Sequence, residues 1–256
     1  MVELQKNLAQ TLTEILSPLS GTINNEVNVP VLRQFVDSLY PSVLELSKRR
    51  KNLPWVAPLV QLLLAVSQKT YFNNHWSIFL DYCLAAIKDV KYSRFCLESV
   101  SNLVWVYCVR HRCEANHTTT TRLNLILKNI FPVGARYVSP RDQPPIIFVR
   151  ILSYIAEVKL ELAMSTVVEL LGAAAIKSTN PERVQICAER QNIGIRAFVT
   201  IANSLQQGEK PILPRNMSLS SGNTIRKKTY LHNPLGRVQN AFFALFESTN
   251  HNYTIV

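Results

Sequence analysis

Side chains able to bind a metal ion occur close together in one stretch of this chain. The stretch contains two cysteines and two histidines: Cys108, His111, Cys113 and His117. Zinc sites made from such ligands use paired CxxC or HxxxH spacings. Neither pairing is present here, and the four positions do not share one face of a helix. We therefore predict that the chain holds neither a metal site nor a cofactor.

The motifs of common enzyme families are also missing from the chain. It contains no GxSxG nucleophile elbow, no phosphate-binding GxxxxGK[ST], no HExxH and no dinucleotide fingerprint. The five histidines are scattered along the sequence: His75, His111, His117, His232 and His251. A site assembled in space from distant residues would leave no such motif. Without a local nucleophile and base, we predict no catalytic residue and no enzymatic activity.

The charge of the chain indicates an acidic partner. The formal net charge is +11, which suits nucleic acid, an anionic membrane surface, an acidic protein or the rest of a larger molecule. Two runs concentrate this charge: Lys48, Arg49, Arg50 and Lys51, and then Arg226, Lys227 and Lys228. Cations of the first run complement the carbonyl end of the preceding helix, which is a purely structural explanation. The second run has no such role and is the better candidate for a contact.

Composition and cysteine content favour an intracellular helical protein. Hydrophobic residues make up 47% of the 256 residues and glycines number only 7, as in proteins with large helical cores. The five cysteines are odd in number and lie mostly in apolar helical patterns, which predicts reduced thiols and a cytoplasmic location. The first 20 residues form an amphipathic pattern that differs from a signal peptide. The most apolar window, Trp55 to Val66, is too short to cross a membrane.

Apolar residues at helical spacing predict a succession of helices. The predicted helices cover residues 28–46, 53–66, 74–87, 93–112, 119–130, 146–156, 160–175 and 180–205. We expect Pro30 in the first turn of the first of these, a kink or break at Pro41, and capping of the third by Asn73 and Asn74. The three tryptophans fall within apolar pattern and are expected in the core: Trp55, Trp76 and Trp105.

Two junctions carry proline and polar residues typical of helix starts. Asp142 is placed to cap a helix that has Pro144 and Pro145 in its first turn. Asn180 is placed in the same way before Pro181 and Glu182. The connection at residues 157–159 is so short that the helices before and after it should form an antiparallel hairpin.

Repeated helix pairs of this kind are the units of HEAT and armadillo arrays. We therefore predict an all-α, helical-repeat (HEAT/armadillo-like) solenoid of antiparallel helix pairs. The expected organisation is an N-terminal amphipathic helix and linker (1–27), a helical-repeat domain (28–207), a linker (208–236), and a partial helix with a truncated tail (237–256). The last part resumes an apolar rhythm at residues 238–246.

Several junction motifs together resemble the N-terminal region of the Furry family of morphogenesis scaffolds, over about Val29 to Phe246. The matching segments are Trp76–Leu80, Leu103–Tyr107, Pro140–Asp142, Asn180–Arg183, Ile195–Phe198, Ser204–Gln207 and Ser221–Thr224. Residues of these motifs are expected to cap helices or to bridge neighbouring repeats: Pro140, Asp142, Asn180, Pro181, Glu182, Arg183, Arg196, Ser221, Gly222 and Asn223.

The resemblance implies a very large cytoplasmic scaffold that supports NDR-family kinases and their MOB co-activators in polarised growth. It also implies links to actin and microtubule-associated proteins, to outgrowths such as neurites, and a place at the cell cortex or the cytoskeleton. This chain would be one fragment that contacts the remainder of the scaffold. Candidate residues for an acidic surface on the kinase or on MOB are Arg136, Arg141, Lys159 and the run Lys48 to Lys51.

The alternative is a basic helical-repeat module that binds nucleic acid or an anionic surface. We expect nucleic acid to be the lesser candidate, because recognised RNA- and DNA-reading motifs are missing. The chain also departs from the family pattern at Val184 to Gln191, where about seven extra residues, nearly two helical turns, fit either a splice variant or a gene-model error. The tail from His251 to Val256 is expected to be a truncation artefact.

Overall fold

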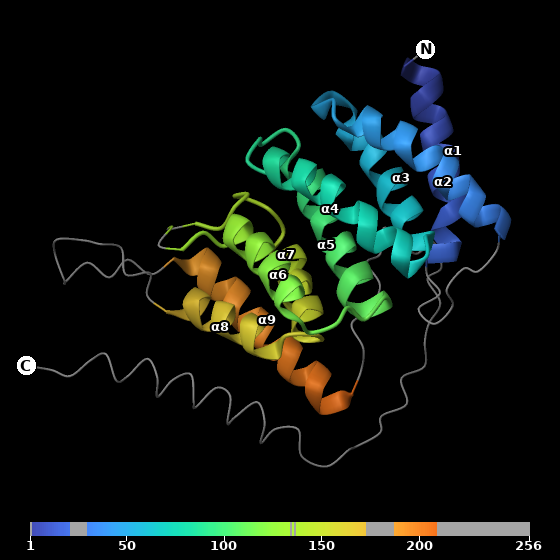
Figure 1. The fold of residues 1–256 in the computed structure, drawn as a ribbon. Helices are drawn as coiled ribbons and strands as arrows, with labels where there is room; N and C mark the ends of the chain where they lie inside the picture. The colour runs from blue at the N-terminus through green and yellow to red at the C-terminus, as the bar shows by residue number, and fades with distance from the viewer. Residues whose placement is uncertain (1, 21–29, 134, 136, 173–186, 209–256) are drawn as a thin grey trace, which may run out of the picture. The chain divides into compact units, whose positions relative to one another are not determined.

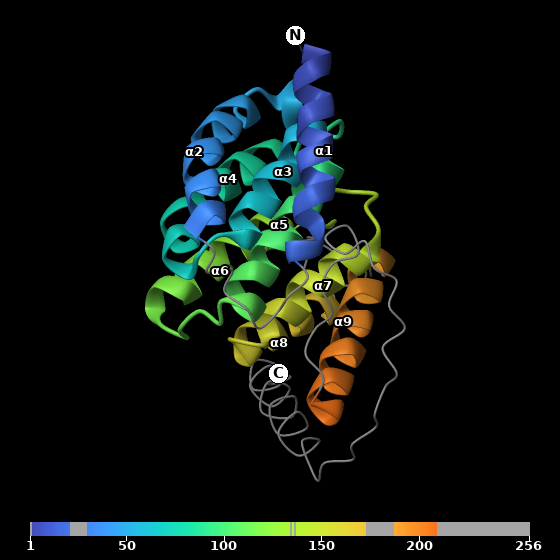
Figure 2. The ribbon, with the colours of Figure 1, turned by 90° about the vertical axis from the view of Figure 1, so that its right-hand side faces the viewer.

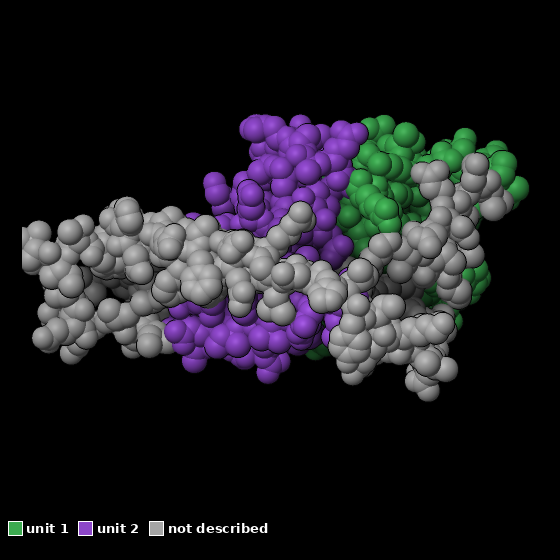
Figure 3. All heavy atoms as spheres, turned by 90° about the horizontal axis from the view of Figure 1, so that it is seen from below, with its two compact units in different colours: residues 1–112, 212–224 green, residues 113–211, 225–256 purple. Residues whose placement is uncertain are grey.

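The computed structural model describes residues 2–20, 30–133, 135, 137–172 and 187–208 (Figure 1). Within these ranges the chain forms packed helices and no β-strand, so the predicted all-α helical-repeat fold is confirmed. The chain divides into two compact units, whose described parts are residues 2–112 and 113–208 (Figure 3). The wider domain boundaries given above stay a prediction. No helix in the described ranges is long and apolar enough to cross a membrane.

The first unit is built around α3, which is apolar on every side. Its helices follow in the order α1 Val2–Ser20, α2 Pro30–Ser47, a 3-10 turn η1 Arg50–Asn52, α3 Leu53–Val66, α4 Lys69–Ala86, α5 Ser93–Trp105 and a π-helical turn η2 Val106–Arg110. A helix that is hydrophobic all round must be covered by neighbours. Helices α1, α2, α4 and α5 all pack against α3, and Figure 2 shows α1 alongside it.

One local prediction for the first unit is wrong, and one of two alternatives predicted at Pro41 is excluded. The helix predicted to start at Asn73 and Asn74 begins earlier, because α4 starts at Lys69 after the extended residue Gln68. The apolar spacing continues upstream of the asparagines, and Phe72 stacks on Trp76 in the core with ring centroids 5.4 Å apart. A break at Pro41 is also excluded, since α2 continues through this proline to Ser47. Burial of Tyr40 and Val43 on either side holds the helix together.

The tryptophans form part of the core as predicted, with one exception. Trp76 and Trp105 are fully buried, whereas Trp55 is half-buried at the start of α3. The ring of Trp76 stacks on Tyr107 with centroids 4.4 Å apart, which joins α4 to the π-helical turn η2. The predicted helix over residues 93–112 is therefore present, but its last turn widens from α to π geometry.

The second unit contains α6 His117–Ile130, α7 Pro145–Ala156, α8 Leu160–Leu171 and α9 Ala188–Gln207. The side chain of Asn116 caps α6 by accepting a hydrogen bond from the backbone N–H of Thr119, at 2.9 Å. The predicted hairpin is confirmed, because α7 and α8 pack together across their short connection. Both helices also pack against α9.

The start of α7 differs from the prediction, since Asp142 is not its N-cap. The helix starts at Pro145 with Pro144 before it, and Asp142 has a left-handed backbone with φ of 59°. A residue that precedes proline is disfavoured in helical geometry, so the two prolines keep Gln143 and Pro144 out of the helix. Asp142 is therefore too far upstream to reach the free N–H groups of the first turn.

The predicted helix over residues 180–205 is shorter than expected. Cys187 has an extended backbone, with φ of −92° and ψ of 102°, and α9 begins after it at Ala188. A continuous helix from Asn180 is therefore wrong, and Asn180 itself lies outside the described residues. The helix ends at Gln207 because Gly208 takes the left-handed conformation, with φ of 62°, that glycine adopts without strain.

Candidate functional site

The cysteines and histidines considered for metal binding have different environments. Cys108 and His111 are buried in the first unit, while Cys113 is half-buried and His117 is exposed in the second. Within the described ranges, no three histidine, cysteine or acidic side chains gather closely enough to hold an ion. His111 instead packs in an aromatic cluster, with its ring centroid 5.1 Å from that of Phe72. Burial, together with the charges of Arg110 and Lys69, lowers the pKa of His111 to about 4, so its imidazole is neutral at physiological pH.

A hollow of about 260 Å³ lies between α2 and the start of α4. Arg33 and Asp37 line it from α2, and Tyr71 and His75 line it from α4. The rings of Tyr71 and His75 stack with centroids 4.0 Å apart, and the Tyr40 hydroxyl donates to the His75 carbonyl oxygen at 3.1 Å. These contacts give the side chains a structural role in joining α2 to α4.

The predicted basic run lies on the surface of the first unit and is joined there by a second group of cations. Lys48, Arg49, Arg50 and Lys51 are all exposed in the turn between α2 and α3. The turn between α4 and α5 adds the exposed residues Lys88 and Lys91. We call these six cations and Val90, which lies between the two lysines, the basic turn surface.

One aspartate holds the two turns of this surface together. Arg50 Nη1 lies 3.8 Å from Asp89 Oδ2, across the gap between the turns. The other carboxylate oxygen of Asp89 accepts a hydrogen bond from the backbone N–H of Lys91 at 3.1 Å. In the first turn, the buried Asn52 side chain donates to the carbonyl oxygen of Leu46 at 3.0 Å. The backbone that carries these cations is therefore fixed by hydrogen bonds.

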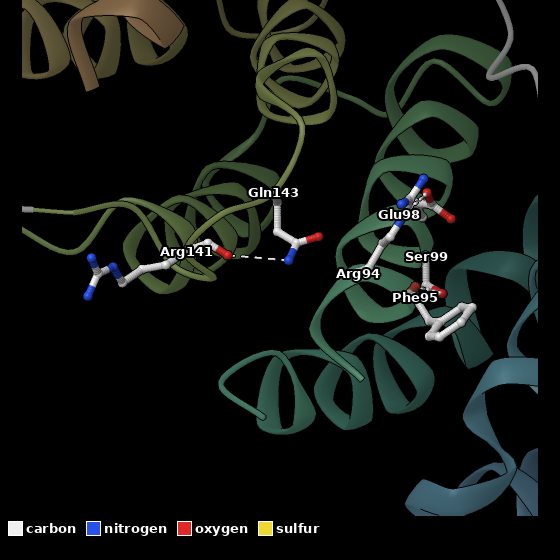
Figure 4. Close-up of polar contacts among 6 residues, drawn as sticks. All are labelled: Arg94, Phe95, Glu98, Ser99, Arg141 and Gln143. Atoms are coloured by element: carbon white, nitrogen blue, oxygen red, sulfur yellow. Dashed lines mark hydrogen bonds and ion pairs between the residues drawn. The ribbon is translucent and has the colours of Figure 1, made fainter. Parts of the chain in front are cut away.

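Most acidic groups near the basic turn surface are already paired. Glu45 forms an ion pair with Lys48, and Asp89 pairs with Arg50. Figure 4 shows Arg94 paired with Glu98 one turn along α5, where the Arg94 Nε atom lies 3.3 Å from the carboxylate. Among the residues that the structure describes, no carboxylate lies within ion-pair distance of Arg49, Lys51 or Lys88.

A second candidate surface is the loop of residues 131–144 in the second unit, which we call the Arg141 loop. The Arg141 guanidinium lies over the ring of Tyr137, with its central carbon 3.9 Å from the ring centroid. The Gln143 side-chain amide donates to the carbonyl oxygen of Arg141 at 3.3 Å. Figure 4 shows the Arg141 side chain extending away from Gln143, and the residue is exposed.

A buried arginine of α9 forms hydrogen bonds with the Arg141 loop. Arg190 is 4% exposed, and its Nη1 atom donates to the carbonyl oxygens of Ala135 at 2.8 Å and Pro132 at 3.3 Å. The neighbouring residue Glu189 has a raised pKa. Burial is the larger cause, and the negative charge of Asp142 in this loop is the second. Arg190 therefore ties the described part of this loop to α9 at two points.

The structure does not gather the remaining candidate residues of the second unit into one site. Arg141 precedes α7 and the half-buried Lys159 follows it, so they lie beyond opposite ends of a helix about 18 Å long. Arg196 is exposed on α9 and Pro140 is buried in the Arg141 loop. The other candidates lie outside the described residues: Arg136, Asn180, Pro181, Glu182, Arg183, Ser221, Gly222, Asn223, Arg226, Lys227 and Lys228.

Several residues of these surfaces were not predicted from the sequence. Lys88 and Lys91 flank Val90 in a short polar stretch between two apolar helices, and that pattern is a usable signal for an exposed turn. No local sequence pattern marks Tyr137 as part of a surface or Arg190 as an anchor of the loop. The role of Arg190 depends on contacts with residues more than 50 positions away along the chain.

Comparison with known proteins gives the relatives of this chain. The cell polarity protein mor2 of Schizosaccharomyces pombe is 28% identical over 129 residues, which are 50% of this chain and 6% of that protein. The cell morphogenesis protein PAG1 of Saccharomyces cerevisiae is 28% identical over 122 residues, which are 46% of this chain and 5% of that protein. The chain thus spans a small part of the length of either relative. No solved structure matches it.

The family match covers nearly the whole chain. A family model described as "Cell morphogenesis N-terminal" matches residues 2–251, which include every described helix of both units. The match thus includes the Arg141 loop and the basic turn surface as well as the helices that carry them. The chain therefore belongs to the cell morphogenesis N-terminal family, and its resemblance to the Furry proteins is confirmed.

Proposed function

We propose that this chain is a non-catalytic interaction fragment of a scaffold for cell morphogenesis and polarised growth. In this proposal it supports signalling by an NDR-family kinase with its MOB co-activator, and through them the organisation of actin and microtubules. It acts in the cytoplasm, at the cell cortex and at sites of polarised growth. Family membership and the names of mor2 and PAG1 support a role in morphogenesis and polarity. The kinase and MOB partners follow from the Furry resemblance.

The single observation that supports a docking site is the stacking of Arg141 on Tyr137 in the Arg141 loop. Arginine and tyrosine are enriched among the residues that dominate protein–protein binding energy, whereas lysine is depleted in such interfaces. The Arg141 guanidinium is exposed while its face rests on the Tyr137 ring at 3.9 Å. A planar guanidinium supported in this way is ready to bind a carboxylate through two parallel hydrogen bonds.

Preorganisation strengthens this assignment. Binding costs less when the loop that carries the contact residues is already ordered. Arg190 supplies that order, since it holds the loop carbonyls of Pro132 and Ala135 at 3.3 and 2.8 Å. We therefore assign the acidic partner surface, on the kinase or on MOB, to the Arg141 loop.

The test is retention of a purified NDR-family kinase with MOB by immobilised residues 1–256 at physiological salt. We expect specific retention by the unaltered chain and its loss in Arg141→Glu, which reverses the charge of an exposed side chain. Lys128→Glu is the matched control, because Lys128 is an exposed cation on α6, outside the loop. A folded chain that retains no kinase would refute the proposal. Equal retention by Arg141→Glu and Lys128→Glu would refute the assignment to the loop.

A further inference from the structure

We propose that the basic turn surface of the first unit binds the headgroups of an anionic phospholipid membrane. This inference goes beyond the proposed function and uses a different surface, since the Arg141 loop belongs to the second unit. It starts from a local imbalance of charge. Six cations gather on two adjacent turns, and the nearby carboxylates of Glu45 and Asp89 are already paired with Lys48 and Arg50.

The remaining cations are free to meet an external anion. Arg49, Lys51 and Lys88 have no carboxylate within ion-pair distance among the described residues. The Lys91 ammonium lies over the Tyr92 ring, 5.5 Å from its centroid, and has no carboxylate partner among the described residues. Each basic residue close to an anionic bilayer contributes to attachment, and the attraction fades within a Debye length. Four such charges on one surface suit a reversible electrostatic contact.

Val90 distinguishes this surface from a purely electrostatic one. Its side chain is 89% exposed at the tip of the α4–α5 turn, between Lys88 and Lys91. The backbone beneath it is fixed, because the Asp89 carbonyl oxygen accepts hydrogen bonds from the N–H groups of Tyr92 at 2.9 Å and Ser93 at 2.8 Å. An apolar tip flanked by lysines can enter the boundary between headgroups and acyl chains while the ammonium groups stay among phosphates.

Two other acidic partners fit this surface less well. Protein interfaces are depleted in lysine, and three of its four unpaired cations are lysines. Single-stranded nucleic acid is bound with the help of exposed aromatic rings on which bases stack. Tyr92, the aromatic side chain within the α4–α5 turn, is 8% exposed and cannot offer such a platform. An anionic membrane needs neither an aromatic platform nor a groove.

The experiment is sedimentation of residues 1–256 with vesicles of phosphatidylcholine alone or mixed with phosphatidylserine. We expect binding only to the mixed vesicles, and weakening as salt is raised. Lys88→Ala/Lys91→Ala should lower the apparent affinity about thirtyfold, as expected for two charges near an anionic surface. The matched control is Lys128→Ala/Arg196→Ala, which removes two exposed charges from the second unit and should leave binding unchanged. Circular dichroism checks that both variants remain helical.

A second measurement tests whether Val90 enters the membrane. The fluorescence of the new tryptophan in Val90→Trp is obtained by subtracting the spectrum of the unaltered chain. Its emission should shift to the blue with phosphatidylserine vesicles and should not shift with duplex DNA. The proposal is overturned if the chain ignores anionic vesicles, or if DNA displaces it from them at physiological salt. It is also overturned if Lys88→Ala/Lys91→Ala binds normally, which would place the contact at Arg226, Lys227 and Lys228 or elsewhere. None of these outcomes bears on kinase retention, which is measured without lipid.

Discussion

The Nη1 atom of Arg190 lies 2.8 Å from the carbonyl oxygen of Ala135, although the two residues are 55 positions apart in the chain. The same nitrogen also donates to the carbonyl oxygen of Pro132. Backbone carbonyl groups withdrawn from water need a donor, and α9 provides one to these two half-buried residues. The loop that carries the candidate residue Arg141 is therefore tied to α9 by a buried side chain.

Replacing this anchor should destabilise the second unit. Arg190→Met keeps much of the buried hydrocarbon but removes the side-chain donor to both carbonyl oxygens, of which that of Pro132 keeps the backbone N–H of Ala135 at 3.2 Å. The free energy of unfolding should therefore fall by about 2 kcal/mol. Urea unfolding followed by circular dichroism measures the change. Arg196→Met makes the same replacement at an exposed position of α9 and should change stability by less than about 0.5 kcal/mol. Equal losses for the two variants would show that Arg190 does not anchor the loop.

His111 should make the first unit sensitive to mild acid. Its folded pKa is about 4, lowered by burial and by Arg110 and Lys69, while an unfolded histidine titrates near pH 6.5. Below that value the unfolded chain binds a proton that the folded chain does not, so stability falls as pH falls. Between about pH 7 and pH 5 the expected loss is about 2 kcal/mol.

The measurement compares the pH dependence of unfolding for the unaltered chain and for His111→Gln. Glutamine does not titrate, so the difference between the two curves isolates the histidine from the carboxylates, which titrate at lower pH. We expect the variant to lose less stability than the unaltered chain over this range. Parallel curves would contradict the burial of a neutral imidazole.

A buried polar network between α3 and α5 should be sensitive to the loss of a single member. Gln61 donates to the Ser99 hydroxyl at 2.8 Å and accepts from the Asn102 side chain. Ser99 in turn donates to the Phe95 carbonyl oxygen at 2.7 Å, and Figure 4 shows these two residues on α5. Gln61→Leu leaves the buried Asn102 amide without its acceptor, so unfolding should cost about 1–3 kcal/mol less.

The control for this network is to remove its polar groups together. Gln61→Leu/Asn102→Leu should recover part of the stability lost in Gln61→Leu, since no amide is then left unpaired. The comparison is made by urea unfolding of Gln61→Leu, Asn102→Leu and the double variant. Simple addition of two separate losses would mean that the two amides act independently.

Gly194 lies at a close approach of α9 to α8. A Cβ at this position would lie 3.0 Å from Leu171 Cδ2 and 3.2 Å from Leu170 Cβ, and the second of these atoms is fixed to the backbone. Gly194→Val should therefore lower the melting temperature, with a loss of about 1–3 kcal/mol from overpacking. Ile195→Val changes the adjacent, 55% exposed position and should have little effect. A more stable Gly194→Val variant would contradict this close approach.

The sequence predicted the helices well where burial alone decides the structure. The largely apolar stretch of α3 and the hairpin of α7 and α8 follow from side-chain spacing, and both are present. Local capping signals were less reliable. Asn73 and Asn74 are common cap residues, but the burial of Phe72 and Trp76 extends α4 past them.

The candidate surfaces could be predicted only in part. The run of Lys48 to Lys51 could be identified from the sequence, because its charges are adjacent in the chain and do not depend on the fold to lie together. The addition of Lys88 and Lys91 depends on a contact between two turns, made by Arg50 and Asp89. Such pairings arise from the packing of α2 to α5 and leave no trace in local spacing.

The dissociation constant of residues 1–256 for an NDR-family kinase with its MOB co-activator tests the central claim most directly. At physiological salt we predict saturable binding that Arg141→Glu weakens by at least about tenfold and Lys128→Glu leaves unchanged. Absence of binding by the folded chain would contradict the proposed kinase support. Equal binding by the unaltered chain and Arg141→Glu would contradict the role of the Arg141 loop.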